Sequence, residues 1–160
     1  MIPALPPSPP AIYCAAETTA LINLEVITDC MAMHESGKVD RTMGRKGELG
    51  RYQFDYATWR IYTDAPFDQA MDYPTAHRVA LVHAEYLARK LAPMADSPES
   101  LIYLIAAGWV SGAESVAHGF IGPNAIAEGE AVVQLYFDAL NLKLPLRKAI
   151  PRPKSKEPML

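Results

Sequence analysis

The chain has 160 residues, of which half are hydrophobic and 21% are charged, and this length and composition are those of one globular domain. The formal net charge is −3, but residues 143–160 carry six Lys and Arg against one Glu, a local charge of +5 (6 − 1), which leaves −8 (−3 − 5) on the rest. An acidic body excludes nucleic acid as the expected partner, because nucleic-acid binding rewards clustered cations.

The two ends of the chain differ in composition from its middle. Residues 1–12 form a Pro-rich arm with five prolines among the first ten positions, and residues 143–160 form a basic, Pro-rich tail. Both compositions predict extended or solvated segments, which leaves residues 13–142 for the folded domain. No signal peptide is visible at the start, and no apolar stretch is long enough to span a bilayer, so we expect no stable membrane insertion.

The first predicted helix covers residues 15–34, where apolar positions recur every three or four residues. Gly37 is a natural stop for this helix. The polar, glycine-rich stretch that follows, residues 38–50, predicts a loop with one or two very short strands. The inner stripe predicted for the helix is Leu21, Leu24, Ile27, Met31 and His34.

Further helices follow along the chain. Residues 55–62 predict a brief helix with Asp55 as its cap, and residues 74–91 predict a second long helix. A helix over residues 98–112 is apolar almost throughout, so it should be the most buried one, and another helix starts at Pro123. The sequence therefore predicts an α+β, mainly α fold with a small β-like insertion. The inner stripe predicted for the second long helix is Val79, Val82, Tyr86 and Leu87.

The remaining reactive side chains give no sign of a metal or cofactor site. Cys14 and Cys30 are the two cysteines, and their apolar surroundings predict buried free thiols. His77 and His83 are six residues apart, so they face different sides of a helix and do not form a metal pair. We therefore expect neither a metal nor a cofactor.

Glu35 is the leading catalytic candidate. It lies at the C-terminal end of the first predicted helix, where the helix dipole disfavours the ionised carboxylate. Apolar neighbours, for which we expect Met33 and Trp109, disfavour that form further by desolvation. A glutamate that stays protonated near neutral pH can donate its proton to a glycosidic oxygen.

Two motifs resemble those of a known family. Glu35-Ser36, followed by the segment 47–53 with its Gly-x-x-Gly-x-x-Gln spacing, resembles the Glu-Ser and Gly-Leu-Met-Gln motifs of the lytic transglycosylase and goose-type lysozyme superfamily. The variant Gly-Arg-Tyr-Gln-Phe at residues 50–54, with Thr58-Trp59 after it, is similar to a form met in phage and bacterial wall-degrading enzymes.

The resemblance implies a lysozyme-like domain that cleaves the β-1,4 bond between N-acetylmuramic acid and N-acetylglucosamine in peptidoglycan, at the cell wall. It makes Glu35 the catalytic acid and base. Gly50 and Gln53 would line the sugar groove, and Tyr52 and Ser36 would also contact substrate. The partner implied is the glycan strand of peptidoglycan.

A third family motif, Ala-Tyr-Asn-x-Gly, has a partial counterpart at residues 107–112. Trp109 aligns with the tyrosine and Val110 with the asparagine, and these two residues cannot make the same hydrogen bonds. Trp109 is kept as a candidate substrate contact. The departure also supports an alternative, in which the chain is a catalytically inactive glycan-binding or assembly protein.

The presence of a second carboxylate would decide the reaction. A hydrolase needs one to activate water, and Asp55 matches a carboxylate position of goose-type lysozymes, with Asp40 and Glu48 as other possibilities. Most lytic transglycosylases lack it, because the 6-hydroxyl of the sugar attacks the anomeric carbon. The sequence favours transglycosylation by Glu35, with a hydrolytic lysozyme or chitinase-like enzyme using Asp55 as the alternative.

Overall fold

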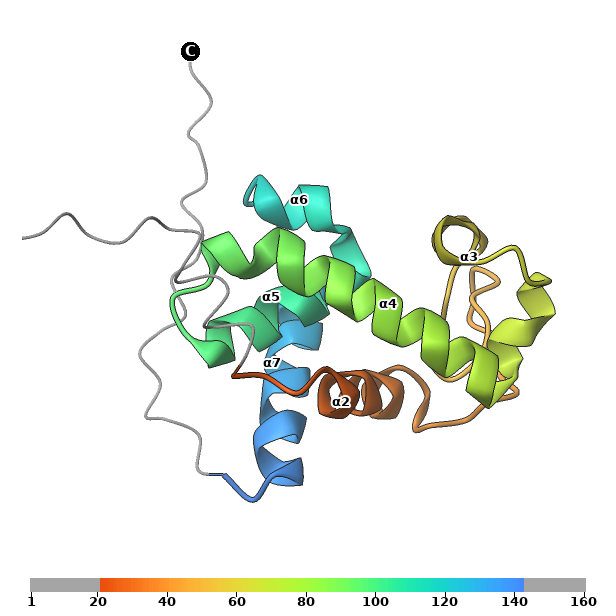
Figure 1. The fold of residues 1–160 in the computed structure, drawn as a ribbon, viewed down its shortest axis with the longest axis horizontal. Helices are drawn as coiled ribbons and strands as arrows, with labels where there is room; N and C mark the ends of the chain where they lie inside the picture. Colours follow the sequence, from red (N-terminus) through yellow and green to blue (C-terminus); the bar gives the residue numbers. More distant parts are fainter. Residues whose placement is uncertain (1–20, 143–160) are drawn as a thin grey trace, which may run out of the picture.

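The structure is a computed structural model that describes residues 21–142 (Figure 1). Within this range the chain is mainly helical, which confirms the mainly α prediction. The Pro-rich arm, the basic tail and Cys14 lie outside the described residues. The helices and 3₁₀ turns are α2 (Leu24–Ser36), α3 (Tyr56–Tyr62), η1 (Phe67–Met71), α4 (Tyr73–Leu91), η2 (Ala92–Met94), α5 (Pro98–Ser111), α6 (Ala113–Ala117) and α7 (Pro123–Ala139).

Helix α2 begins later than predicted. Asn23 caps it, because its side-chain oxygen accepts the amide hydrogen of Val26, and the two residues before Asn23 are not helical. Leu21 is consequently 70% exposed, so its place in the inner stripe was wrong. The helix ends as predicted at Gly37, whose φ of +65° closes the last turn in the left-handed region.

Helix α5 is the centre of the fold, as its apolar sequence predicts. Ser97 and Ser100 form a reciprocal capping box at its start, and residues 100–108 are all buried because α4, α6 and α7 surround the helix. Gly108 allows the close approach of α4, since a Cβ there would lie 3.0 Å from Leu87 and from Leu91.

Helix α4 is the long helix that runs from the helices around α5 to the part of the molecule that holds α3 and the loop before it (Figure 1). Its buried face is built largely from alanines, with Val79 and Leu87 buried as predicted. Val82 and Tyr86 are 49% and 37% exposed, so the predicted stripe was partly wrong. The alanine face, which hydrophobicity alone did not single out, lets α2 and α5 pack closely on α4.

The predicted β-like insertion is reduced to two isolated bridges within residues 43–54. Leu49 pairs with Met43 and with Phe54, and no longer strand is present in the described range. Asp55 caps α3 as predicted, through bonds from the Thr58 amide and hydroxyl. The short helices η1 and α6 were not predicted, because so few residues give no readable period.

Two buried clusters result. The larger one surrounds α5 with residues of α2, α4 and α7, and the smaller one lies beneath the loop, α3 and the start of α4. Trp109 packs against both clusters, at the end of α5. Helix α2 contributes Ile27 and Met31 to the larger cluster and Ala32 to the smaller one, so its last turn, which carries Glu35, lies where the two clusters meet.

Candidate functional site

Glu35 occupies the last turn of α2 and is half-buried. Its pKa is raised to about 7, mainly by burial and also by the nearby carboxylates of Glu128 and Glu48, while His34 opposes the rise. Met33, expected as an apolar neighbour, is 44% exposed instead. The side chain predicted to be the acid thus has the protonation behaviour that an acid needs near neutral pH.

Glu128 on α7 is the residue that the sequence did not reveal. Its side chain is buried, with the residue only 3% exposed, and burial raises its pKa to about 7. One carboxylate oxygen is hydrogen-bonded to Nδ1 of His34, and Oε1 has no partner in the structure. The sequence feature that could have identified Glu128 is its helical spacing from Ala125 and Val132, which places it on the buried face of α7.

Ser36 ties the end of α2 to the loop. Its hydroxyl donates to the Arg51 carbonyl at 2.9 Å and accepts the Val39 amide at 3.1 Å. Ser36 was predicted to contact substrate, but in the structure its hydroxyl is engaged within the protein. Its place beside Glu35 instead brings residues 50–53 against the end of α2.

Gly50 and Gln53 shape the loop on that side. Both have positive φ, +77° at Gly50 and +48° at Gln53, and Gln53 Nε2 donates to the Gly50 carbonyl at 2.7 Å. The Gln53 amide oxygen and the Glu48 carboxylate both lie against Gly44. These contacts place Gln53, a predicted substrate contact, in one cluster with Glu48, which acts electrostatically on Glu35.

The backbone of Gly50 also lies close to the Ala70 carbonyl group, so a side chain at position 50 should destabilise the fold. A Cβ there would overlap the Ala70 carbonyl oxygen, whereas Gly47, also at positive φ, has open space around it. We expect Gly50→Ala to lower the free energy of unfolding by about 3 kcal/mol or more, and Gly47→Ala by only about 1 kcal/mol of backbone strain. Urea denaturation of both variants measures this, and equal losses would contradict the role of the overlap.

Tyr52 and Trp109 are placed differently from the prediction. Tyr52 is 1% exposed, with its hydroxyl 2.8 Å from Nδ1 of His77, so its ring is not available to stack on a sugar. Trp109 donates its indole N–H to the Tyr52 carbonyl at 3.3 Å and lies between Phe54 and His83. Both residues therefore support the loop from inside.

Three carboxylates are candidates for the second acid. Asp55 is occupied as the cap of α3 and acts electrostatically on His83, and it is not among the charges that shift the pKa of Glu35. Asp40 is paired with Arg51. Glu48 accepts a hydrogen bond from the Lys46 amide at 2.9 Å, and its charge raises the pKa of Glu35. Of the three carboxylates, Glu48 is therefore the one that interacts electrostatically with the candidate acid.

His77 and His83 have separate surroundings, as their spacing predicts. His77 contacts Tyr52 and Glu25, whereas His83 is buried against Tyr62 and Trp109, and burial lowers its pKa to about 4. Over residues 21–142 no three His, Cys, Asp or Glu side chains are grouped to hold a metal ion. In the same range, no helix has the length and apolarity to cross a membrane.

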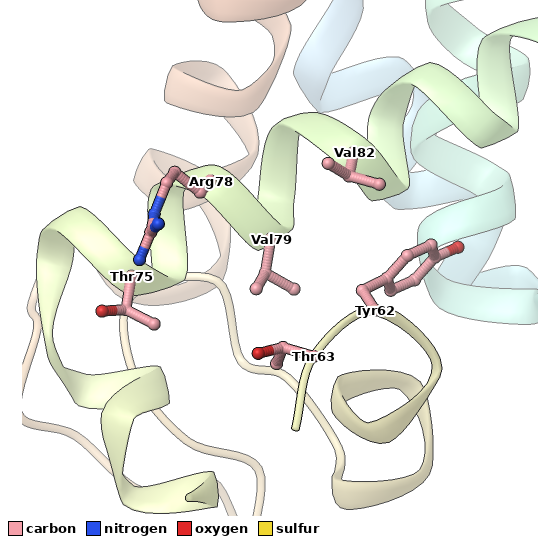
Figure 2. Close-up of a pocket in the computed structure, with 6 residues that line it drawn as sticks. All are labelled: Tyr62, Thr63, Thr75, Arg78, Val79 and Val82. Carbon is pink, nitrogen blue, oxygen red and sulfur yellow. The ribbon is translucent and has the colours of Figure 1, made fainter. Parts of the chain in front are cut away.

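A small pocket lies elsewhere on α4. It has a volume of about 150 Å³ and is lined by Thr75, Arg78, Val79 and Val82 of α4 together with Tyr62 and Thr63 (Figure 2). None of these residues belongs to the set around Glu35. The pocket also has no carboxylate, so it offers no acid for glycoside chemistry.

Comparisons with family models, with curated proteins and with solved structures found no match to this chain.

Proposed function

We propose that the protein is a lysozyme-like glycosidase that cleaves peptidoglycan strands at the cell wall, with Glu35 as general acid and base. The observation that carries this proposal is the half-buried Glu35 at a helix end, with its pKa raised to about 7 beside a buried second carboxyl group, Glu128. The segment 50–53, whose motif resembles the sugar-binding loop of the family, is tied to the same helix end by Ser36.

The proposed reaction is transglycosylation. Protonated Glu35 donates its proton to the glycosidic oxygen between N-acetylmuramic acid and N-acetylglucosamine as the bond from that oxygen to the anomeric carbon breaks. The 6-hydroxyl of the muramic acid then forms a new bond to the anomeric carbon and gives its proton to ionised Glu35. The products are a strand with a 1,6-anhydro end and a released N-acetylglucosamine end.

One observation favours hydrolysis as a second candidate function. Glu48 is a loop carboxylate whose charge reaches Glu35, and a hydrolase uses such a group to activate water. In that reaction water would replace the 6-hydroxyl as nucleophile, with Glu48 rather than Asp55 as its base. The product would carry a reducing end.

Wall clearing by the purified protein tests the proposed function, and mass spectrometry of the released fragments identifies the reaction. Anhydro ends support transglycosylation, and reducing ends support hydrolysis. A protein that binds walls but releases no fragment would be the inactive glycan-binding alternative.

The loop beside the site also fits an anionic substrate. Arg41, Arg45 and Lys46 are exposed, and within the described part of the chain none of them is in an ion pair. The Lys46 amide contacts Glu48, so this turn adjoins the candidate site. Peptidoglycan carries peptide carboxylates along its glycan strands, which such cations attract.

We expect the triple variant Arg41→Gln, Arg45→Gln, Lys46→Gln to bind walls roughly tenfold more weakly, with the difference shrinking at high salt. Co-sedimentation with purified walls measures the binding. The control removes the same charge from exposed positions elsewhere, by Arg60→Gln, Arg78→Gln and Arg89→Gln. Equal losses in the two triple variants would show that net charge alone, and not this loop, attracts the wall.

A further inference from the structure

The phenol of Tyr52 starts a hydrogen-bonded chain that leads from the core to the surface, where the Glu25 side chain is 61% exposed. Because Tyr52 is 1% exposed, its hydroxyl needs a partner inside the protein, and that partner is Nδ1 of His77 on α4 at 2.8 Å. The other ring nitrogen of His77, Nε2, lies 2.8 Å from a carboxylate oxygen of Glu25 on α2. The chain Tyr52–His77–Glu25 thus joins the loop, α4 and α2.

The contacts define where the protons lie when His77 is neutral. An ionised carboxylate only accepts hydrogen bonds, so Glu25 requires the hydrogen on Nε2 of His77. Nδ1 is then an acceptor, and the Tyr52 hydroxyl donates to it. Burial raises the pKa of Tyr52, so the phenol retains the hydrogen that it donates.

The same segment is held at its backbone by two further bonds. Ser36 donates to the Arg51 carbonyl, and Trp109 donates to the Tyr52 carbonyl. Neither bond orients the Tyr52 ring, which lies directly before Gln53. His77 is therefore the polar contact that fixes this side chain, from an element outside the loop.

We propose that His77 is a positioning residue for the segment 50–53, acting through the Tyr52 hydroxyl, and that Glu25 selects the His77 tautomer that accepts this bond. The inference rests on the proposed function, in which this segment binds the glycan. His77 contacts neither Glu35 nor a reacting atom, so it acts on substrate binding and not on the acid.

The experiment compares two substitutions of His77 in the full chain. His77→Leu removes the acceptor, and we expect KM for soluble glycan fragments to rise roughly three- to tenfold, the effect of one lost hydrogen bond. His77→Asn restores it, because the asparagine side-chain oxygen lies at the level of Nδ1. Neither variant should change kcat or the pH dependence of kcat.

Tyr52→Phe provides the matched test at the other end of the bond. It should raise KM as His77→Leu does, and the double variant should be no worse than either single one, because both remove the same bond. A fall in melting temperature with unchanged KM in His77→Leu would overturn the proposal, as would equal behaviour of the Leu and Asn variants.

Amide hydrogen exchange separates this inference from the proposed function. The Leu49 and Phe54 amides bond each other's carbonyls at the two ends of the segment. We expect His77→Leu to speed exchange at both amides without affecting α5, and His77→Asn to restore protection. A wild type that cleaves no glycan but shows this pattern would refute the enzyme while supporting the positioning role, and unchanged exchange would refute the positioning role itself.

Discussion

Glu35→Gln is expected to lower wall-clearing activity at least about a hundredfold, because an amide cannot donate the proton that the leaving oxygen needs. Glutamine has nearly the same shape as glutamate, and it also removes a half-buried carboxyl group whose charged form is disfavoured. The fold should therefore be kept, with a melting temperature no lower than that of the wild type. Turbidity of purified walls measures the activity, and circular dichroism checks the fold.

Glu130→Gln is the matched control for charge, since Glu130 is exposed on α7 and outside the site. We expect it to clear walls like the wild type. Glu48→Gln and Asp55→Asn then separate the reactions: transglycosylation requires neither carboxylate, whereas hydrolysis requires one of them. Full activity in Glu35→Gln would remove the basis of the proposed function.

Glu128→Gln is expected to move the alkaline limb of the activity profile to lower pH, by roughly one unit, because a neighbouring negative charge that keeps Glu35 protonated is removed. Burial and Glu48 continue to raise the pKa of Glu35, so the limb should stay above the ordinary range of a glutamate. The glutamine amide can still form a hydrogen bond with Nδ1 of His34, because it carries both a donor and an acceptor. The measurement is kcat against pH, between about pH 4 and 9.

The same substitution should change how stability depends on pH. Glu35 and Glu128 each have a folded pKa of about 7, above the ordinary value of 4.5, so the folded state holds their protons more tightly than the unfolded state. Their contribution to stability is therefore present below about pH 4.5 and is lost as the pH rises through about 7. Glu128→Gln should flatten this decline, and Glu130→Gln should not.

An unchanged alkaline limb in Glu128→Gln would mean that burial alone sets the pKa of Glu35. A limb that moves to higher pH would contradict the electrostatic coupling between the two carboxyl groups.

The sequence determined the features that arise within a few residues of one another. The capping hydroxyl of Ser97, the carboxylate of Asp55 and the left-handed Gly37 each satisfy backbone groups at a helix end, so these boundaries were predictable. The continuous apolarity of residues 101–108 predicted the buried centre of the fold. The place of Glu35 at a helix end was predictable for the same local reason.

The spacing of hydrophobic residues along α4 did not predict correctly which side chains are buried, because burial there depends on which helices pack against each face. Val82 and Tyr86 are hydrophobic yet exposed, while the alanine face of α4 is buried, because close helix packing selects small side chains over large ones. Tyr52 looked like a groove residue by its motif, but its ring lies inside the protein, where His77 accepts its hydroxyl.

The candidate site itself was decided by the tertiary structure. Glu35 and its motif were readable from the sequence, but Glu128 follows on another helix, and the hydrogen bond between His34 and Glu128 spans 94 positions of the chain. Which carboxyl groups face each other depends on how α2 and α7 are rotated and packed, and no local pattern encodes that rotation. The sequence by itself thus determined the residue proposed as the acid, whereas only the packing of the helices decided which charges set its pKa, because desolvation and Coulomb interactions depend on distance in space and not on distance along the chain.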